Sequence, residues 1–180
     1  MEPKTIMPPN QGNEYDLRDL RVLVVDDSEF MLDLFVQIFE NLGCKGVVRA
    51  ENGKEAIDAI NLSMEEGRDD MLYDVVFSDW AMEPMNGLEL LDWIRMHPNP
   101  EIRFTPFIMV SAYSTLDWVI EARDHGVNEF LTKPVSVKSL VSRMTSIIEK
   151  PRAFVKSTSY FGPDRRRRNV DYSGPDRRKR

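Results

Sequence analysis

The sequence is poor in the features that mark exported or membrane-inserted proteins. It holds a single cysteine, Cys44, so no disulfide can form within the 180 residues. No apolar run approaches the roughly 20 residues that a helix needs to span a bilayer. The start, Met1 to Lys4, lacks the charged and then apolar pattern of a signal peptide. We therefore expect a cytoplasmic protein with no membrane insertion.

Basic residues are scarce in most of the chain and concentrated near its end. Residues 150–180 hold 11 of the 24 lysines and arginines but 3 of the 30 acidic residues, which leaves 13 basic against 27 acidic residues in 1–149. The acidic sign of the main part argues against nucleic acid binding by it. The basic end contains two near-copies of one segment, 160–166 and 172–178, and little apolar material. We expect a disordered or weakly ordered tail over 150–180.

The main part alternates strand-like and helix-like segments. Residues 1–19 hold several prolines and predict a flexible lead-in, and residues 20–149 predict one domain. Five strands are predicted at Val22–Val25, Val47–Ala50, Val75–Ser78, Phe107–Val110 and Val127–Leu131. A helix is predicted after each strand, beginning near Ser28, Asn52, Gly87, Thr115 and Val137. Such alternation predicts a doubly wound α/β fold with a parallel sheet covered on both faces.

Reactive side chains follow four of these strands. Asp26 and Asp27 end the first strand, Asp79 ends the third, Ser111 ends the fourth, and Lys133 follows the last. Parallel sheets bind their ligands at the carboxyl ends of strands, so these side chains are expected to meet. Carboxylates are ligands for Mg²⁺, and an aspartate can accept a phosphoryl group. Lys133 and Ser111 suit phosphoryl oxygens. Singly, each residue is more often an ordinary turn or cap; their combination predicts the site.

The motifs that carry these residues resemble the receiver domain of two-component response regulators, over about residues 20–149. The matching segments are Asp26-Asp27, Asp79 to Gly87, Ser111-Ala112, and Phe130 to Pro134. The resemblance implies a five-stranded flavodoxin-like sheet of order 2-1-3-4-5. It implies a phosphoprotein in which Asp79 is the acceptor for a histidine kinase or phosphotransfer protein, as in bacterial signalling.

The resemblance also implies roles for the residues around Asp79. Mg²⁺ would be held by Asp26, Asp27, Asp79 and the backbone carbonyl of Ala81. Ser111 and Lys133 would bind the phosphoryl oxygens, and the Lys133–Pro134 bond would be cis. Ser111 and Phe130 would form the switch that reports phosphorylation, although Phe130 could equally be ordinary core.

Two further positions, Glu83 and Trp118, are open from the sequence. Glu83 lies close enough in the chain to touch the metal, but a solvated loop glutamate is the simpler interpretation. Trp118 falls off the apolar stripe of its helix, so it is either a partner contact or a partly buried side chain. With Phe130, it defines a possible partner surface.

The resulting hypothesis is a stand-alone response regulator that changes its protein-binding surface and catalyses only its own phosphorylation and dephosphorylation. The alternatives are a phosphate-independent, receiver-like adaptor and, less favoured, an aspartyl-phosphate phosphatase, which usually needs an acid two residues after the nucleophile, where Ala81 stands. The basic tail could be solvated, bind an acidic or phosphorylated partner, or dock on the acidic main part. Nucleic acid is the less favoured target.

Overall fold

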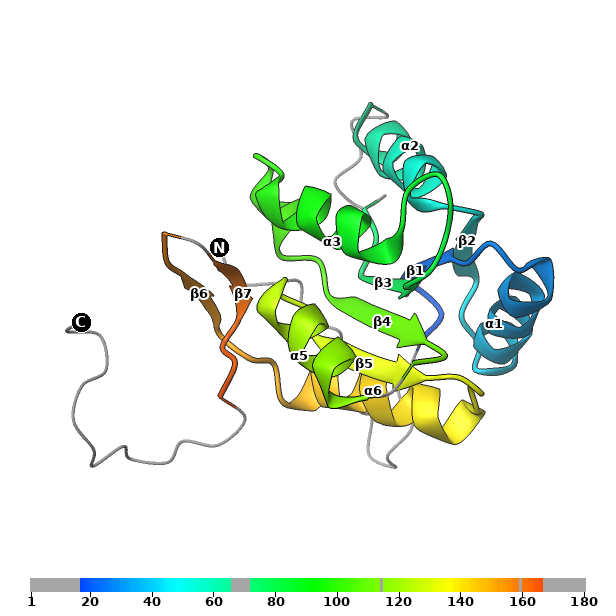
Figure 1. Ribbon diagram of the computed structural model, residues 1–180. Helices are drawn as coiled ribbons and strands as arrows, with labels where there is room; N and C mark the ends of the chain where they lie inside the picture. Colours follow the sequence, from blue (N-terminus) through cyan, green and yellow to red (C-terminus); the bar gives the residue numbers. More distant parts are fainter. Residues whose placement is uncertain (1–16, 66–71, 114, 159, 167–180) are drawn as a thin grey trace.

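The computed structural model describes residues 17–65, 72–113, 115–158 and 160–166 (Figure 1). Most of the predicted lead-in and the end of the predicted tail lie outside these residues. The central sheet has the order β2-β1-β3-β4-β5, and every pair within it is parallel, which confirms the predicted fold. Its strands are β1 (Arg21–Val25), β2 (Gly46–Ala50), β3 (Val75–Asp79), β4 (Phe107–Ser111) and β5 (Glu129–Thr132).

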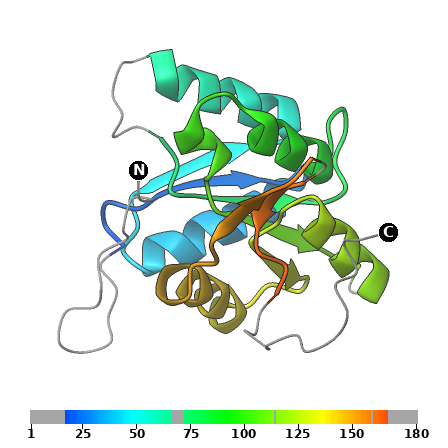
Figure 2. The same cartoon turned by 90° about the vertical axis from the view of Figure 1, so that its left-hand side faces the viewer.

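Helices cover both faces of the sheet (Figures 1 and 2). The helices are α1 (Glu29–Asn41), α2 (Gly53–Glu65), α3 (Gly87–Met96), α4 (Pro100–Arg103), α5 (Leu116–Asp124) and α6 (Val137–Glu149). One apolar core contains buried side chains of α1 and α6, including Phe35 and Leu140. The other contains side chains of α2, α3 and α5, including Ile60, Leu91 and Ala122. The inner strands β1, β3 and β4 are therefore buried on both sides, as their continuous apolar sequences require, whereas the edge strand β2 is partly exposed.

Local capping explains where several helices begin. Ser28 caps α1, and its hydroxyl accepts a hydrogen bond from the amide of Met31. Asn86 and Glu89 form a capping box at the start of α3. The short helix α4 was not predicted from the sequence, because prolines such as Pro98 and Pro100 are typical of the end of a helix. In the structure Pro100 stands in the first turn of α4, a position that tolerates proline because its amide has no helical partner.

The C-terminal segment departs from the sequence prediction. Strands β6 (Phe154–Lys156) and β7 (Phe161–Pro163) pair antiparallel and lie beside the main domain (Figure 1). The rings of Phe154 and Phe161 lie 5.4 Å apart, and each contacts Phe104, with centroid distances of 4.9 and 5.2 Å. The prediction of a disordered or weakly ordered tail therefore fails at Phe154–Lys156 and Phe161–Pro163, which form paired strands. Few apolar residues suffice here because the domain provides the other half of the packing surface.

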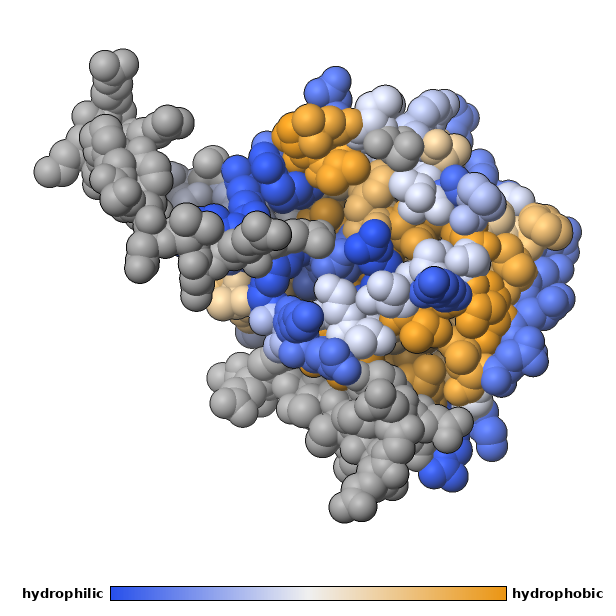
Figure 3. Space-filling model, turned by 90° about the horizontal axis from the view of Figure 1, so that it is seen from below, coloured by the Kyte–Doolittle hydropathy of each residue, from blue (hydrophilic) through white to orange (hydrophobic). Residues whose placement is uncertain are grey.

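The outer surface on the side of α6 is partly apolar (Figure 3). A shallow groove between α1 and α6 is lined by Leu17, Phe39, Met144 and neighbouring apolar side chains. Within the described ranges, no helix has the length and hydrophobicity required to cross a membrane.

Candidate phosphorylation site

The carboxyl ends of the inner strands bring the predicted site residues together. Backbone hydrogen bonds align these ends: the amide of Trp80 donates to the carbonyl of Val110 at 2.9 Å, and that of Lys133 donates to the carbonyl of Ser111 at 2.8 Å. The polar side chains that follow each strand consequently face one place. This is the edge at which parallel sheets carry their ligand sites.

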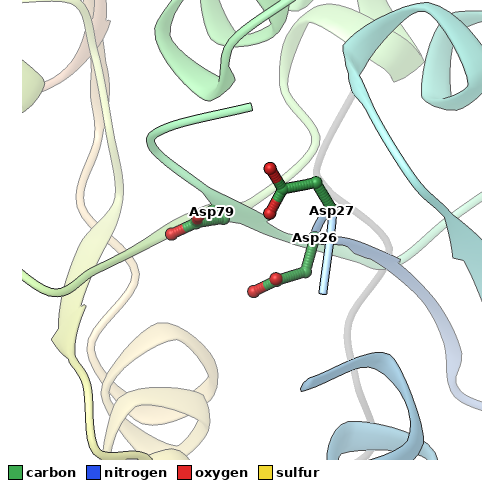
Figure 4. Close-up of side chains that lie close together, drawn as sticks. All are labelled: Asp26, Asp27 and Asp79. Atoms are coloured by element: carbon green, nitrogen blue, oxygen red, sulfur yellow. The ribbon is translucent and has the colours of Figure 1, made fainter. Parts of the chain in front are cut away.

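Three carboxylates form the centre of the site (Figure 4). Asp26, Asp27 and Asp79 each present an oxygen within 4.8 Å of the others. Asp26 and Asp79 are buried, with 1% and 8% of their surface exposed, whereas Asp27 is exposed. Hard oxygen donors at this spacing, with one side open to solvent, fit Mg²⁺, which keeps water ligands beside its carboxylates.

Lys133 supplies the positive charge of the site. Its ammonium lies 2.8 Å from Asp26 Oδ2 and 3.1 Å from Asp79 Oδ1. Burial acts to lower the pKa of Lys133, but the hydrogen bond to Asp26 and the charge of Asp79 outweigh it, so its pKa is raised. One ammonium beside three carboxylates leaves an anionic site, which a divalent cation would neutralise.

Burial also raises the pKa of Asp79 above its ordinary value of 3.8. The charge of Asp26 acts in the same direction, and Lys133 opposes both. The net effect shows that the protein holds Asp79 in an environment that disfavours its negative charge. Binding of a cation, or transfer of a phosphoryl group to the carboxylate, is favoured because either one reduces the unfavourable charge on Asp79.

Gly87 shapes the loop that follows Asp79, and this role was missed from the sequence. A side chain at Gly87 would place its Cβ 2.0 Å from the carbonyl oxygen of Asp79, so no other residue fits without moving the site. The amide of Gly87 also donates to the carbonyl of Trp80 at 3.0 Å. A glycine in the first turn of a helix, where it is a poor helix former, was the available signal.

The Glu83–Pro84 and Lys133–Pro134 bonds are both cis, the second as predicted.

Ser111 connects the site to an aromatic cluster. Its buried hydroxyl accepts a hydrogen bond from the amide of Tyr113 at 3.0 Å. Trp118 stacks on Tyr113 at 5.1 Å and contacts Trp80 edge-on at 4.7 Å. The sequence singled out Trp118 but not this cluster, because its three members come from separate segments.

The remaining candidates are less central. Phe130 is half-buried against the core on the α3 side of the sheet, and Trp118 is half-buried as well. The carboxylate cluster found among the described residues does not include Glu83, which is exposed. Ala81 is exposed in the loop after Asp79, and no described contact tests its carbonyl as a ligand.

This fold and this site define a class of signalling domain. The family model of the response regulator receiver domain matches residues 22–145. The chain therefore belongs to the response regulator receiver family.

Individual relatives agree with that assignment. The chain is 28% identical to the chemotaxis protein CheY-3 of Vibrio cholerae serotype O1 over 133 residues, which cover 74% of this chain and 95% of the relative. It is 27% identical to the chemotaxis protein CheY of Pseudomonas aeruginosa over 131 residues, covering 73% and 98%.

Solved structures give the same result. The receiver domain of the Francisella response regulator 1452 matches with a TM-score of 0.61 and 30% identity, covering 74% of this chain and 99% of that one. A Borrelia burgdorferi complex described as CheX-CheY-BeF3-Mg matches with a TM-score of 0.62 and 26% identity, covering 71% and 88%.

Proposed function

We propose that this chain acts as a response regulator in which Asp79 accepts a phosphoryl group from a histidine kinase or phosphotransfer protein. The observation that carries the proposal is the contact of Lys133 with both Asp26 and Asp79 beside the third carboxylate, Asp27. Its place of action would be the cytoplasm. The chain would catalyse only reactions of its own aspartate.

The proposed reaction uses Asp79 as a nucleophile. One of its carboxylate oxygens attacks the phosphorus of a phosphohistidine, and the N–P bond breaks as its electron pair returns to the ring nitrogen. The ammonium of Lys133 binds one phosphoryl oxygen, and this contact replaces part of its ion pair with Asp79. The hydroxyl of Ser111 donates to a second. Water later hydrolyses the acyl phosphate and releases inorganic phosphate.

Mg²⁺ is the proposed cofactor, held by the carboxylates of Asp26, Asp27 and Asp79 and by the carbonyl of Ala81. It would reduce the repulsion between the anionic nucleophile and the anionic phosphoryl donor.

The proposed output is a change of protein-binding surface. Ser111 and Phe130 are the proposed switch residues, with Trp118 and Phe130 as candidate partner contacts. The hydrogen bond between Ser111 and Tyr113 supports a link from the site to this surface. An acidic partner for the basic tail remains a second proposed contact.

The proposal is tested by incubating the protein with acetyl phosphate and measuring its intact mass. We expect the addition of one phosphoryl group with Mg²⁺ and none after chelation by EDTA. Asp79→Asn should remain unmodified. Asp33→Asn, which alters an exposed carboxylate paired with Arg49, is the matched control and should be modified normally. Equal modification of Asp79→Asn and the wild type would reject Asp79 as the acceptor.

Two alternatives are separated by further outcomes. Rapid turnover of phosphomonoesters would identify an aspartyl-phosphate phosphatase. If Asp79→Asn leaves partner binding and cellular output unchanged, the phosphate-independent adaptor is the better interpretation. Because every residue that the proposed reaction needs is present, the response regulator is the favoured hypothesis.

A further inference from the structure

The C-terminal hairpin, formed by β6 and β7, packs against the end of α3 and the turn before β5. Arg95, on α3, is 4% exposed and lies under it, with its guanidinium 5.1 Å from the ring centroid of Phe154. Burial lowers the pKa of Arg95 to about 9, which leaves it a cation at neutral pH. Its hydrogen bonds go to the carbonyls of Gly126, Arg103 and Thr105 and to the side chain of Asn128.

The same hairpin contacts the end of α5. Gly162 lies so close to Gly126 that a Cβ on Gly162 would come within 2.6 Å of the Gly126 Cα. Just beyond β7, Arg165 forms an ion pair with Asp124 at 3.3 Å. The hairpin therefore cannot move closer to the turn after α5. If it moves away, the ion pair between Arg165 and Asp124 breaks.

Helix α5 is the least buried of the longer helices. Ala122 is its one buried residue, whereas α1, α3 and α6 each bury two or more. Its first turns are held by Trp118, which lies between Trp80 and Tyr113. Trp80 directly follows Asp79, and Tyr113 is hydrogen-bonded to Ser111. One end of α5 thus contacts the neighbours of Asp79 and Ser111 through Trp118, and the other end reaches the C-terminal segment through Asp124 and the turn at Gly126.

We propose that α5 couples the phosphorylation site to the C-terminal hairpin, so that a phosphoryl group on Asp79 loosens the hairpin. The inference rests on the proposed function. When Ser111 turns toward the phosphoryl group, Tyr113 and Trp118 move with it, and α5 shifts against the anchored hairpin. The described contacts fit the unmodified site, so any shift of α5 disturbs the packing of Gly126 on Gly162.

The consequence is an output at the pole opposite the site. Loosening exposes more of the rings of Phe104, Phe154 and Phe161 and frees Arg165 from Asp124. A surface of aromatic and basic groups suits an acidic protein partner. In this arrangement the hairpin of the unmodified chain covers part of that surface, since Phe104 keeps 38% of its surface exposed.

Coupling of this kind is reciprocal. If phosphorylation weakens the docking of the hairpin, then weakening the docking must tighten binding of a phosphoryl mimic by the same factor. Gly162→Ala misfits against Gly126 and should tighten binding of beryllium fluoride with Mg²⁺ about five-fold. Arg165→Ala removes one exposed ion pair and should tighten it about two-fold. Lys156→Ala removes the same charge from the exposed part of β6 and should change nothing.

Hydrogen–deuterium exchange of the full chain, read by mass spectrometry, tests the coupling directly. With beryllium fluoride and Mg²⁺ added, we expect faster exchange in peptides covering 154–164 and slower exchange around Asp79. Asp79→Asn should show neither effect. The affinities of the variants are measured by titrating beryllium fluoride and following tryptophan fluorescence.

The outcomes distinguish this coupling from the proposed function. Protection around Asp79 with unchanged or slower exchange at 154–164 would overturn the coupling alone. Equal affinities of Gly162→Ala, Lys156→Ala and the wild type would do the same. If beryllium fluoride changes exchange nowhere in the chain, both the proposed function and the coupling are rejected.

Discussion

At the scale of single residues, the protein places the carboxylate of Asp79 where burial and a second carboxylate disfavour its negative charge. Asp79 is 8% exposed and lies beside a second buried carboxylate, Asp26. Lys133 compensates part of this charge, but burial still raises the pKa of Asp79. The negative charge of such an aspartate raises the free energy of the folded state. Binding of a metal ion or transfer of a phosphoryl group can remove this destabilisation.

We predict that Asp79→Asn stabilises the fold by on the order of 1 kcal/mol at neutral pH. Because the folded-state pKa of Asp79 lies above 3.8, the folded protein takes up this proton before the unfolded chain does. Falling pH then relieves the cost in the wild type. The advantage of Asp79→Asn should therefore shrink as the pH falls through that raised pKa, as measured by urea denaturation. A difference that stays constant with pH would contradict this account.

Phe30 is the second residue with a specific expectation. It is 74% exposed on the first turn of α1, three positions after Asp27. An exposed aromatic side chain beside the site suits contact with a protein phosphodonor. We expect Phe30→Ala to reduce kcat/KM for transfer from a phosphorylated histidine kinase roughly five-fold. Phosphorylation by acetyl phosphate should not change.

The control for Phe30→Ala is Leu62→Ala. Leu62 is 59% exposed near the end of α2 that points away from the site, so its removal should affect neither donor. Equal slowing of Phe30→Ala with both donors would show that Phe30 supports the site itself.

At the scale of elements, the turn between α5 and β5 joins the hairpin to the domain. Gly126 has a φ of +92° and would place a Cβ 2.8 Å from the carbonyl oxygen of Phe161. Gly43, after α1, has a φ of +85° but no atom within 4 Å of a Cβ. The two glycines share the left-handed conformation, and only Gly126 also contacts the hairpin.

These glycines separate backbone strain from hairpin docking. We predict that Gly43→Ala costs about 1 kcal/mol of unfolding free energy, from its backbone conformation alone. Gly126→Ala should cost about 2 kcal/mol more, because it also displaces the hairpin. Thermal and urea denaturation of both variants would measure the difference. Equal losses would mean that the hairpin adds nothing at this turn.

At the scale of the whole molecule, the folded unit extends beyond the receiver segment matched at residues 22–145. Arg152 donates to the carbonyls of Val127 and Asn128, and Arg165 pairs with Asp124. The first copy of the repeated segment, 160–166, is therefore part of the domain. This agrees with one sequence-based hypothesis, docking of the basic tail on the protein itself, for this copy.

Truncation tests the extent of the domain. A chain ending at Lys150 loses the hairpin and should be about 2–4 kcal/mol less stable than the full chain, since it leaves aromatic and arginine side chains uncovered. A chain ending at Arg166 keeps every described contact and should match the full chain. Both should still be phosphorylated by acetyl phosphate at low temperature. Equal stability of the chain ending at Lys150 would show that the hairpin is an appendage.

Much of the site could be predicted because its signals are local. Each inner strand is a short apolar run that ends in a polar residue, and Asp79, Ser111 and Lys133 are found by position alone. The polypeptide path of a parallel sheet then brings these residues to one edge. The aromatic cluster of Trp80, Tyr113 and Trp118 could not be predicted, because nothing in the sequence pairs rings from different loops.

The sequence by itself determined the sheet and the set of side chains at its carboxyl edge, and the family resemblance supplied the strand order. These features could be predicted because apolar periodicity and strand ends depend on residues that are neighbours in the chain. Only the tertiary structure decided the fate of the C-terminal segment. Its strands are short, and its stabilising contacts, such as Phe154 on Arg95 and Gly162 on Gly126, join residues far apart in the chain. Contacts of that kind depend on a surface that exists only after the domain has folded.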